Sequence, residues 1–364
     1  MVKIERLAPR KIEVDESKPI SLKHYSLKSI ERDYNESKLP YMVLWLDEGC
    51  NLNCGYCATN SKNVDSQNYF PNKNNLSPVQ ITELINQFAD LGGKVINING
   101  QGEPFLNPKL LDYIKLSKDY DIDTIITTNG TLIGKENAKK SYDNDVSFNV
   151  KLHALYKDFH NITVGKDAFD NTYNGLKNLM SYYYDKISEE KDEVISPISI
   201  MTLVFKDALP YVPDVLRFNR ENIFYPSLDD LVCEGRAKTK SWTEQIISNE
   251  EMSKLIKGFE EIMGYDYPQP AKTLCPASVG IFMGSEGKLL IDRNNFCCDG
   301  LAEETNLKFP EKSLHEIWEN LLEARKNTKI QFDPEAVERM LKRKICYGMA
   351  KTQLDALKEF KPTS

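Results

Sequence analysis

Three cysteines lie within eight residues of this sequence, at Cys50, Cys54 and Cys57. Their C-x3-C-x2-C spacing allows one loop to bind three irons of a [4Fe–4S] cube, which leaves the fourth iron open to another ligand. A zinc site and three ordinary buried thiols are the alternatives. Structural zinc usually has four protein ligands, however, and no fourth Cys or His lies nearby. The spacing therefore favours an iron–sulfur cluster with one open iron.

The other five cysteines are distributed unevenly. Cys233 stands alone, and four fall in the last quarter of the chain, at Cys275, Cys297, Cys298 and Cys346. Clustered cysteines in a long chain without an apolar leader are typical of metal binding or catalysis rather than of disulfides. Residues 1–15 are charged and lack the apolar segment of a secretory signal, so we expect a cytoplasmic protein.

The charge of the chain argues against nucleic acid as a partner. The 364 residues include 47 Lys and Arg against 54 Asp and Glu, which gives a net charge of −7. Binding of phosphate backbones needs a concentrated positive surface, and the longest basic run is only Lys342-Arg343-Lys344. No apolar run approaches the roughly 18 residues of a membrane span. We therefore expect neither nucleic acid nor a membrane as a partner.

Short apolar runs alternate with helical patterns from residue 41 onward. Six strands are predicted, at Tyr41–Leu46, Val95–Asn99, Thr124–Thr127, Val146–Leu152, Ile198–Val204 and Ile223–Val232, the last broken by Pro226. Such alternation predicts the α/β class, with a parallel sheet and right-handed crossovers. When such a sheet is closed or partly closed, its chemistry lies at the carboxyl ends of the strands. The three-cysteine loop follows the first strand, at that edge.

Helix signals mark the connections and suggest the domain limits. A helix begins after the N-cap Ser77 and ends at Gly92-Gly93. Eight more helices are predicted, at Pro108–Tyr120, Lys135–Tyr142, Ala168–Tyr183, Leu209–Asn219, Glu250–Met263, Ser313–Asn327, Pro334–Lys344 and Gly348–Lys358. We expect an extension packed on the main domain over residues 1–40, a β/α core over 41–240 and a smaller domain over 241–364.

The cysteine loop and the motifs that follow it resemble the radical SAM (S-adenosylmethionine) superfamily. Tyr56 matches the aromatic residue of its cysteine motif, and Gly100–Pro104 (GQGEP) is similar to its GGE motif, with Gln101 in place of a glycine. Thr127–Gly130 (TTNG) is similar to its TNG motif. The resemblance implies a partial (β/α)6 barrel in which the open iron of the cluster chelates SAM.

The resemblance also implies roles for individual side chains and for partners. The backbone of Tyr56 would contact the adenine of SAM, Gly102 and Glu103 would receive its amino group, and Asn129 would lie near its ribose. Lys151 and His153 end the fourth strand and are candidate SAM contacts, with a surface or core role as the alternative. An electron donor such as flavodoxin or ferredoxin is expected.

The cysteines of the last quarter resemble the auxiliary-cluster module called SPASM, or its shorter form, twitch. In this small α+β domain, Cys275, Cys297 and Cys346 match the ligands of an additional [4Fe–4S] cluster. Cys298 or Asp299 could be a fourth ligand, or one iron could stay open. The Gly287-to-Cys297 spacing is longer than in the module, and Cys346 lacks a second cysteine after it. Reduced structural thiols are the alternative.

Cys233 precedes Gly235–Ala237, which resembles the GRA element at the same place in SPASM and twitch enzymes. The resemblance puts this element over the active site, where the Cys233 thiol could donate a hydrogen atom to a substrate radical. The alternative is a small apolar side chain at a strand end.

Three functions follow from these features. The first is an enzyme whose 5′-deoxyadenosyl radical abstracts hydrogen from a peptide or sugar-type natural product, with Cys233 completing an epimerisation. The second is dehydrogenation or thioether formation, with the auxiliary cluster as electron acceptor. The third is a non-catalytic iron–sulfur redox or sensor protein. Met1–Pro40 is too short for a leader-peptide domain, which favours a small or short substrate over a long peptide.

Overall fold

The computed structural model describes residues 5–9, 11–23, 38–267, 280–290 and 307–327. The four cysteines predicted to bind an auxiliary cluster, Cys275, Cys297, Cys298 and Cys346, lie outside these residues, as do Asp299 and the helices predicted at 334–344 and 348–358. Within the described residues, no helix is long and apolar enough to cross a membrane.

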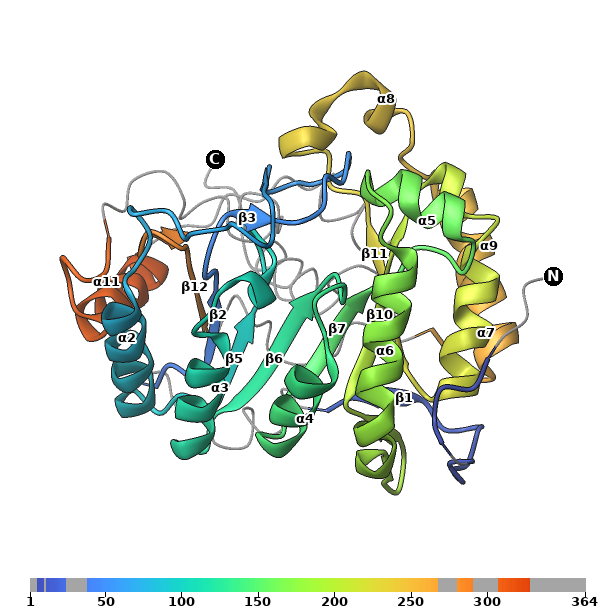
Figure 1. Cartoon of the computed structure of the whole chain (residues 1–364), viewed down its shortest axis with the longest axis horizontal. Coiled ribbons are helices and arrows are strands. Elements are labelled where there is room, and N and C mark those ends of the chain that lie inside the picture. Colours follow the sequence, from blue (N-terminus) through green and yellow to red (C-terminus); the bar gives the residue numbers. More distant parts are fainter. Residues whose placement is uncertain (1–4, 10, 24–37, 268–279, 291–306, 328–364) are drawn as a thin grey trace, which may run out of the picture.

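One sheet of eight strands forms the centre of the molecule (Figure 1). Its order is β11-β10-β7-β6-β5-β2-β12-β13. The strands are β2 (Tyr41–Leu44), β5 (Val95–Ile98), β6 (Asp123–Thr128), β7 (Ser147–Lys151), β10 (Ile198–Val204), β11 (Tyr225–Asp230), β12 (Gly280–Met283) and β13 (Leu289–Leu290). The seven strands from β11 to β12 are parallel, and β13 is antiparallel to β12. The predicted α/β class with a parallel sheet is therefore confirmed.

Helices connect the parallel strands, and several lie together along one face of the sheet (Figure 1). They are α2 (Pro78–Asp90), α3 (Leu110–Asp119), α4 (Lys135–Asp143), α5 (Lys157–Val164), α6 (Phe169–Tyr183) and α7 (Val212–Asn222). Helix α2 begins as predicted, because the Ser77 side chain accepts from the Gln80 backbone and the Gln80 side chain accepts from the Ser77 backbone. This capping box satisfies two N–H groups at the helix start.

The main core lies between the sheet and these helices. Strand residues such as Ile126 and Phe148 pack with helix residues such as Phe88 and Leu179, and all four side chains are fully buried. Each large apolar side chain contributes about 1.5–3 kcal/mol when it leaves water. The central strands β2 (YMVL) and β5 (VINI) are buried at every position, because both of their faces are covered. Burial on this scale holds the carboxyl ends of the strands in fixed positions.

The sixth strand differs from its prediction, because Pro226 does not break it. β11 pairs with β10 through its whole length, with Pro226 opposite Ile200. Among the described residues β11 is an edge of the sheet, and a proline on an edge can turn its missing N–H away from the ladder. Helix α5 was not predicted at all.

Smaller elements complete the described chain. Segment 188–193 begins a hairpin whose strands form a second sheet with the N-terminal segment: β1 (Ile20–Leu22), β8 (Ser188–Glu189) and β9 (Val194–Ser196). The remaining helices are α8 (Lys240–Thr243), α9 (Asn249–Met263) and α11 (Leu314–Asn327), with 3-10 turns η1 (Pro104–Leu106), η2 (Tyr184–Lys186), η3 (Lys206–Ala208) and η4 (Gly235–Lys238). Helix α9, predicted at Glu250–Met263, begins with a capping box between Ser248 and Glu251. The chain limits proposed for the three domains stay a prediction.

Candidate active site

The three-cysteine loop extends from the carboxyl end of β2. Its first residues form β3 (Gly49–Cys50), which pairs in parallel with β4 (Lys62–Asn63). The Val64 N–H donates to the Cys50 carbonyl at 2.9 Å, so both ends of the loop are joined. Inside the loop, the Cys57 N–H donates to the Cys54 carbonyl at 3.3 Å. The chain therefore curls, and its three thiols come to one side of the sheet.

A cavity of about 300 Å³ lies at this end of the sheet, and all three cysteines line it. The predicted SAM contacts line it as well: Tyr56, Gly102, Glu103, Asn129, Lys151 and His153. These residues come from four places in the chain, at the carboxyl ends of β2, β5, β6 and β7. Cys233 is the exception among the predicted site residues, since its neighbours Val232 and Arg236 line the cavity and Cys233 itself does not.

Hydrogen bonds surround the thiol sulfurs. The Leu52 N–H donates to the Sγ of Cys50 at 3.4 Å, and the Ser61 N–H donates to the Sγ of Cys57 at 3.3 Å. Burial, with the nearby Glu103 charge, raises the pKa of the Cys50 thiol to about 12. Burial also acts to raise the pKa of Cys57, but hydrogen bonds with Ser61 and Thr59 outweigh it and leave that pKa below its usual value. The loop thus supports a thiolate at its third cysteine.

The donor set fits an iron–sulfur cluster. In the described part of the chain, no three His, Cys, Asp or Glu side chains gather tightly enough to hold a single metal ion. The three thiols instead line one shared cavity, and a [4Fe–4S] cluster takes one thiolate for each protein-bound iron. Thiols of raised pKa give up their protons when metal binds, because the thiolate is the ligand. Cys50, Cys54 and Cys57 would therefore hold three irons and leave the fourth open.

Glu103 is a buried carboxylate that three donors hold in place. The Thr128 hydroxyl donates to its Oε1 at 2.7 Å, the Phe105 N–H to Oε1 at 3.1 Å and the Asn129 N–H to Oε2 at 2.8 Å. Only 3% of Glu103 is exposed. Burial raises its pKa, although the hydrogen bonds from Asn129, Thr128 and Phe105 act in the opposite direction. A fixed carboxylate in a cavity is suited to bind a cationic group.

Gly100 and Gly102 of the 100–104 motif lie so close to neighbouring atoms that only glycine fits at either position. Gly100 has φ +101°, and a Cβ there would lie 1.8 Å from the Nε1 of Trp45. A Cβ on Gly102 would lie 2.3 Å from the Gly49 carbonyl oxygen. Neither position has room for a side chain. The motif is therefore packed directly against the start of the cysteine loop, which brings Glu103 to the cavity.

Asn129 joins the third strand to the cysteine loop. Its Nδ2 donates to the Asn51 Oδ1 at 2.9 Å, and its Oδ1 accepts from the Thr131 N–H at 2.9 Å. The Asn51 Nδ2 donates in turn to the Thr131 hydroxyl at 2.8 Å. Asn129 was predicted to lie near the SAM ribose; it lines the cavity, and its amide is occupied by the loop. It therefore also positions the loop, a role that the sequence did not suggest.

Tyr56 and His153 form a buried polar contact on the other wall. Their side chains meet with Oη and Nε2 2.6 Å apart. The Leu203 N–H donates to the Nδ1 of His153 at 3.2 Å, so the ring proton lies on Nε2 and is donated to Tyr56. Burial lowers the pKa of His153 well below its usual value, with the positive charge of Lys151 adding to the effect. Neutral His153 therefore fixes the Tyr56 ring beside the cysteines.

Sequence reasoning missed the acidic end of β11. Asp229 and Asp230 line the cavity as well. Burial raises the pKa of Asp229, whose Oδ1 accepts from the Ser227 hydroxyl at 3.1 Å. The predicted strand ran on to Val232 and placed both residues inside it. The usable signal was their position near the end of the sixth strand, where chemistry is expected.

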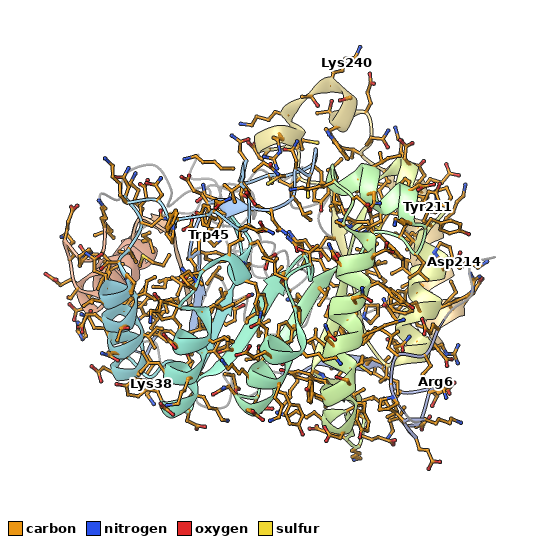
Figure 2. All side chains as sticks on the ribbon, in the orientation of Figure 1. Arg6, Lys38, Trp45, Tyr211, Asp214 and Lys240 are labelled. Carbon is orange, nitrogen blue, oxygen red and sulfur yellow. The ribbon has the colours of Figure 1, made fainter. Side chains whose placement is uncertain are left out.

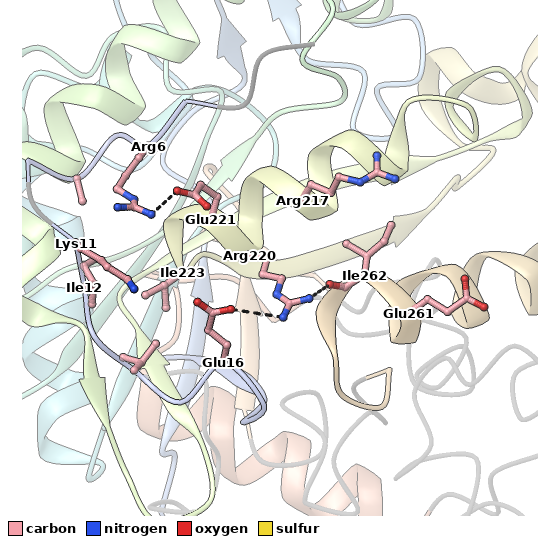
Figure 3. Close-up of a pocket in the computed structure, with 12 residues that line it drawn as sticks. Arg6, Lys11, Ile12, Glu16, Arg217, Arg220, Glu221, Ile223, Glu261 and Ile262 are labelled. Atoms are coloured by element: carbon pink, nitrogen blue, oxygen red, sulfur yellow. Dashed lines mark hydrogen bonds and ion pairs between the residues drawn. The ribbon is translucent and has the colours of Figure 1, made fainter. Parts of the chain in front are cut away.

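A larger cavity, of about 450 Å³, is shown in Figure 3, and it shares no lining residue with the cavity of the cysteines. Residues of the N-terminal segment, α7 and α9 line it. Four of its charged side chains form two ion pairs: Arg6 contacts Glu221 at 2.6 Å, and Arg220 contacts Glu16 at 3.5 Å. The Arg220 side chain also donates to the Ile262 carbonyl at 2.6 Å. None of the predicted site residues is there.

Residues 47–189 match the family model of the radical SAM superfamily. The chain contains a radical SAM domain. The match includes the three cysteines, the 100–104 motif and the 127–130 motif, so the predicted family is confirmed on the residues that suggested it. This domain implies SAM and a SAM-binding [4Fe–4S] cluster, which the thiols described above fit.

Curated relatives match part of this chain. The Fe-coproporphyrin III synthase of Methanosarcina barkeri is 30% identical over 146 residues, which are 40% of this chain and 35% of that protein. The GTP 3′,8-cyclase of Aliarcobacter butzleri is 33% identical over 143 residues, 38% of this chain and 42% of that protein. The match thus spans less than half the length of either relative.

Solved structures show a similar fold over most of the chain. SuiB of Streptococcus suis, bound to its precursor peptide SuiA, has a TM-score of 0.59 at 16% identity, over 81% of this chain and 68% of SuiB. The enzyme anSMEcpe with bound AdoMet also has a TM-score of 0.59 at 16% identity, over 85% of both chains. These similarities concern the fold, and they support the predicted arrangement of the sheet.

Proposed function

We propose that this protein is a radical SAM enzyme that cleaves SAM reductively and abstracts a hydrogen atom from a peptide or small-molecule substrate. The observation that supports this most directly is the shared cavity. It gathers Cys50, Cys54 and Cys57 with the buried carboxylate of Glu103 at the carboxyl ends of the strands. A redox sensor would need the three thiols, but it would not need a fixed carboxylate beside them.

Each side chain has a defined task in this proposal. When bound, a [4Fe–4S] cluster supplies the electron that splits SAM into methionine and a 5′-deoxyadenosyl radical. The three cysteines hold that cluster, and Glu103 accepts the ammonium of SAM on an oxygen that its three donors have already oriented. Lys151 ends β7 on the cavity wall and is suited to the carboxylate of SAM. The protein thus contributes binding and orientation, while the cofactor supplies the difficult chemistry.

The substrate would occupy the side of the cavity lined by β10 and β11. Met201, Leu203 and Val232 give that wall an apolar surface, and Asp229 and Asp230 add acidic groups. The fold similarity to SuiB, which was solved with a precursor peptide, favours a peptide. The sequence relatives that are GTP 3′,8-cyclases favour a small molecule. Both substrate classes therefore stay within the proposal.

Epimerisation, with Cys233 as hydrogen donor, is the proposed fate of the substrate radical; the thiyl radical left on Cys233 would regain an electron from the external donor and a proton from solvent. Cys233 directly follows Val232, which lines the cavity, and it is a free thiol of intermediate exposure. Oxidation by an auxiliary cluster on Cys275, Cys297 and Cys346 is the competing proposal. Turnover in D2O separates them, because an exchanged thiol would put one deuterium on the inverted carbon. An oxidised product would be two hydrogens lighter and carry no label.

The test of the general proposal is SAM cleavage by the reconstituted full-length chain. The protein is loaded with iron and sulfide without oxygen, reduced with dithionite and given SAM. We expect 5′-deoxyadenosine and methionine in equal amounts. A protein that binds a [4Fe–4S] cluster but yields no 5′-deoxyadenosine would contradict the enzyme and favour an iron–sulfur redox protein.

A further inference from the structure

The turn that follows β11 lies against the three-cysteine loop. It comprises η4 and α8, and Lys240 of α8 is at the same end of the molecule as β3 (Figures 1 and 2). Gly235 has φ +54°, and a Cβ there would lie 2.4 Å from the Ala58 carbonyl oxygen and 2.5 Å from that of Cys57. Only a glycine permits this approach. The two segments are therefore in backbone contact although about 180 residues separate them.

Arg236 binds the cysteine loop at three carbonyl groups. Its Nε–H donates to the Cys54 carbonyl at 2.8 Å, and an Nη1–H donates to the Ser61 carbonyl at 2.5 Å. Its backbone N–H donates to the Cys57 carbonyl at 3.0 Å. Two of these three carbonyls belong to the proposed iron ligands. The planar guanidinium can bind two separate acceptors at once, which a lysine ammonium does with less geometric control.

Trp242 packs on the same loop from α8. A Cβ on Gly55 would lie 2.9 Å from the Nε1 of Trp242, and the Trp242 ring meets that of Tyr56 edge-on at 6.0 Å. The Phe205 ring meets the Trp242 indole edge-on, with the two ring centroids 5.4 Å apart. The middle of the cysteine loop has no strand or helix of its own between β3 and β4. Its conformation therefore depends on contacts from outside, and this turn provides several of them.

We propose that Gly235, Arg236 and Trp242 form a clasp that holds the cysteine loop in its metal-binding conformation, with Arg236 as the positioning residue. The clasp rests on the proposed function, since it presumes that the three thiols bind a cluster. Arg236 also brings a positive charge to the cavity wall beside Cys54 and Cys57. Because a reduced cluster on three thiolates is negative, this charge makes reduction easier.

The test compares Arg236→Gln, Arg236→Lys and Arg220→Gln in the full-length chain. Arg220 is the matched control, because it also donates to a carbonyl from another segment but lies at the larger cavity (Figure 3). Three quantities are measured: amide hydrogen exchange of residues 50–61 in the metal-free chain, the rate of iron loss to a chelator in the loaded chain, and the cluster's midpoint potential.

Arg236→Gln should raise exchange and iron loss about tenfold or more, since hydrogen bonds from a charged group are lost. Its potential should become more negative. Arg236→Lys should keep the potential and part of the protection, and Arg220→Gln should match the wild type. Equal iron loss in Arg236→Gln and Arg220→Gln, or an unchanged potential in Arg236→Gln, would overturn the clasp.

Failure of the clasp and failure of the proposed function give different results. If Arg236→Gln does not fold, the Arg236→Lys variant tests the clasp instead. Amide exchange and iron loss equal to those of the wild type in Arg236→Lys would then overturn the clasp. If the wild-type chain binds no cluster, the proposed function fails. The exchange of residues 50–61 in the metal-free chain then still shows whether Arg236 holds the loop.

Discussion

The two cavities of this molecule differ in how their charged side chains are buried and partnered. Around the cysteine loop, Glu103 is buried and its oxygens accept from fixed backbone and hydroxyl donors. In the larger cavity, Arg6 and Glu221 are about 40% exposed and pair directly with each other. Exposed pairs contribute little, because water already solvates both charges. A buried carboxylate held by donors is costly to desolvate, and it is ready to bind an opposite charge.

The larger of the two cavities is therefore not the one that we propose for SAM. The larger cavity, of about 450 Å³, contains the ion pairs of Arg6 with Glu221 and of Arg220 with Glu16. The smaller one, of about 300 Å³, contains three thiols and an oriented carboxylate. Binding capacity depends on polar groups that the fold orients toward a ligand, and those lie at the carboxyl ends of the strands. The following predictions test this contrast, starting with the largest effect.

The largest expected effect is loss of SAM cleavage when one cysteine of the loop is removed. Cys54→Ala should yield no 5′-deoxyadenosine above background, because the cluster loses one of its three protein ligands. Cys233→Ala is the comparison at a thiol outside the loop. It should still cleave SAM, although the proposed epimerisation would fail. Chromatographic measurement of 5′-deoxyadenosine checks both, and undiminished cleavage by Cys54→Ala would contradict the site.

Much of this site was predictable from the sequence, because its residues lie in short motifs. Cys50, Cys54 and Cys57 are close in the chain, and Glu103 and Asn129 follow predicted strands. Periodicity also placed the six strands, since parallel strands buried on both faces read as apolar runs. The same logic put the motifs at one edge of the sheet, where the structure brings them into one cavity.

The parts of the fold and of the site that the sequence did not predict depend on contacts between segments far apart in the chain. No local sequence pattern reveals such contacts. β12 joins the sheet beside β2, although about 240 residues separate them. Pro226 suggested a broken strand, but its place on an edge removes the conflict. The bonds from Arg236 to the cysteine loop span about 180 residues. Short motifs therefore identify what a site contains, while tertiary packing decides how it is held.

The second prediction concerns Glu103. Glu103→Ala should weaken SAM binding by about tenfold or more, because a charge-assisted hydrogen bond contributes about 1.5–3 kcal/mol. The visible absorbance of the cluster should be unchanged, since Glu103 is not an iron ligand in this proposal. Glu221→Ala is the matched control from the larger cavity and should leave SAM binding as it is. Equal affinities in the two variants, measured by calorimetry, would contradict the assigned role of Glu103.

The third prediction uses two glycines. Gly102→Ala should destabilise the cysteine loop and lower cluster content, because its Cβ would lie 2.3 Å from the Gly49 carbonyl oxygen. Gly258→Ala, in the middle of α9, meets nothing within 4 Å. It should raise the free energy of unfolding by about 1 kcal/mol, since alanine favours a helix over glycine. Denaturation measures the free energy of unfolding of both variants, and iron analysis measures their cluster content. If Gly102→Ala changed neither quantity, the cysteine loop would be able to move away from the added methyl group, and the prediction would be wrong.

The smallest expected effect is at the larger cavity. Arg6→Ala removes the 2.6 Å pair with Glu221, and both partners are exposed enough for water and salt to screen them. The free energy of unfolding should therefore fall by less than about 1 kcal/mol, and SAM cleavage should be unchanged. Urea denaturation at low and high salt measures the first, and the 5′-deoxyadenosine assay measures the second. A large loss of SAM cleavage in Arg6→Ala would contradict this prediction. It would show that the charges of the larger cavity affect the chemistry at the cysteines, so the two cavities would not be independent.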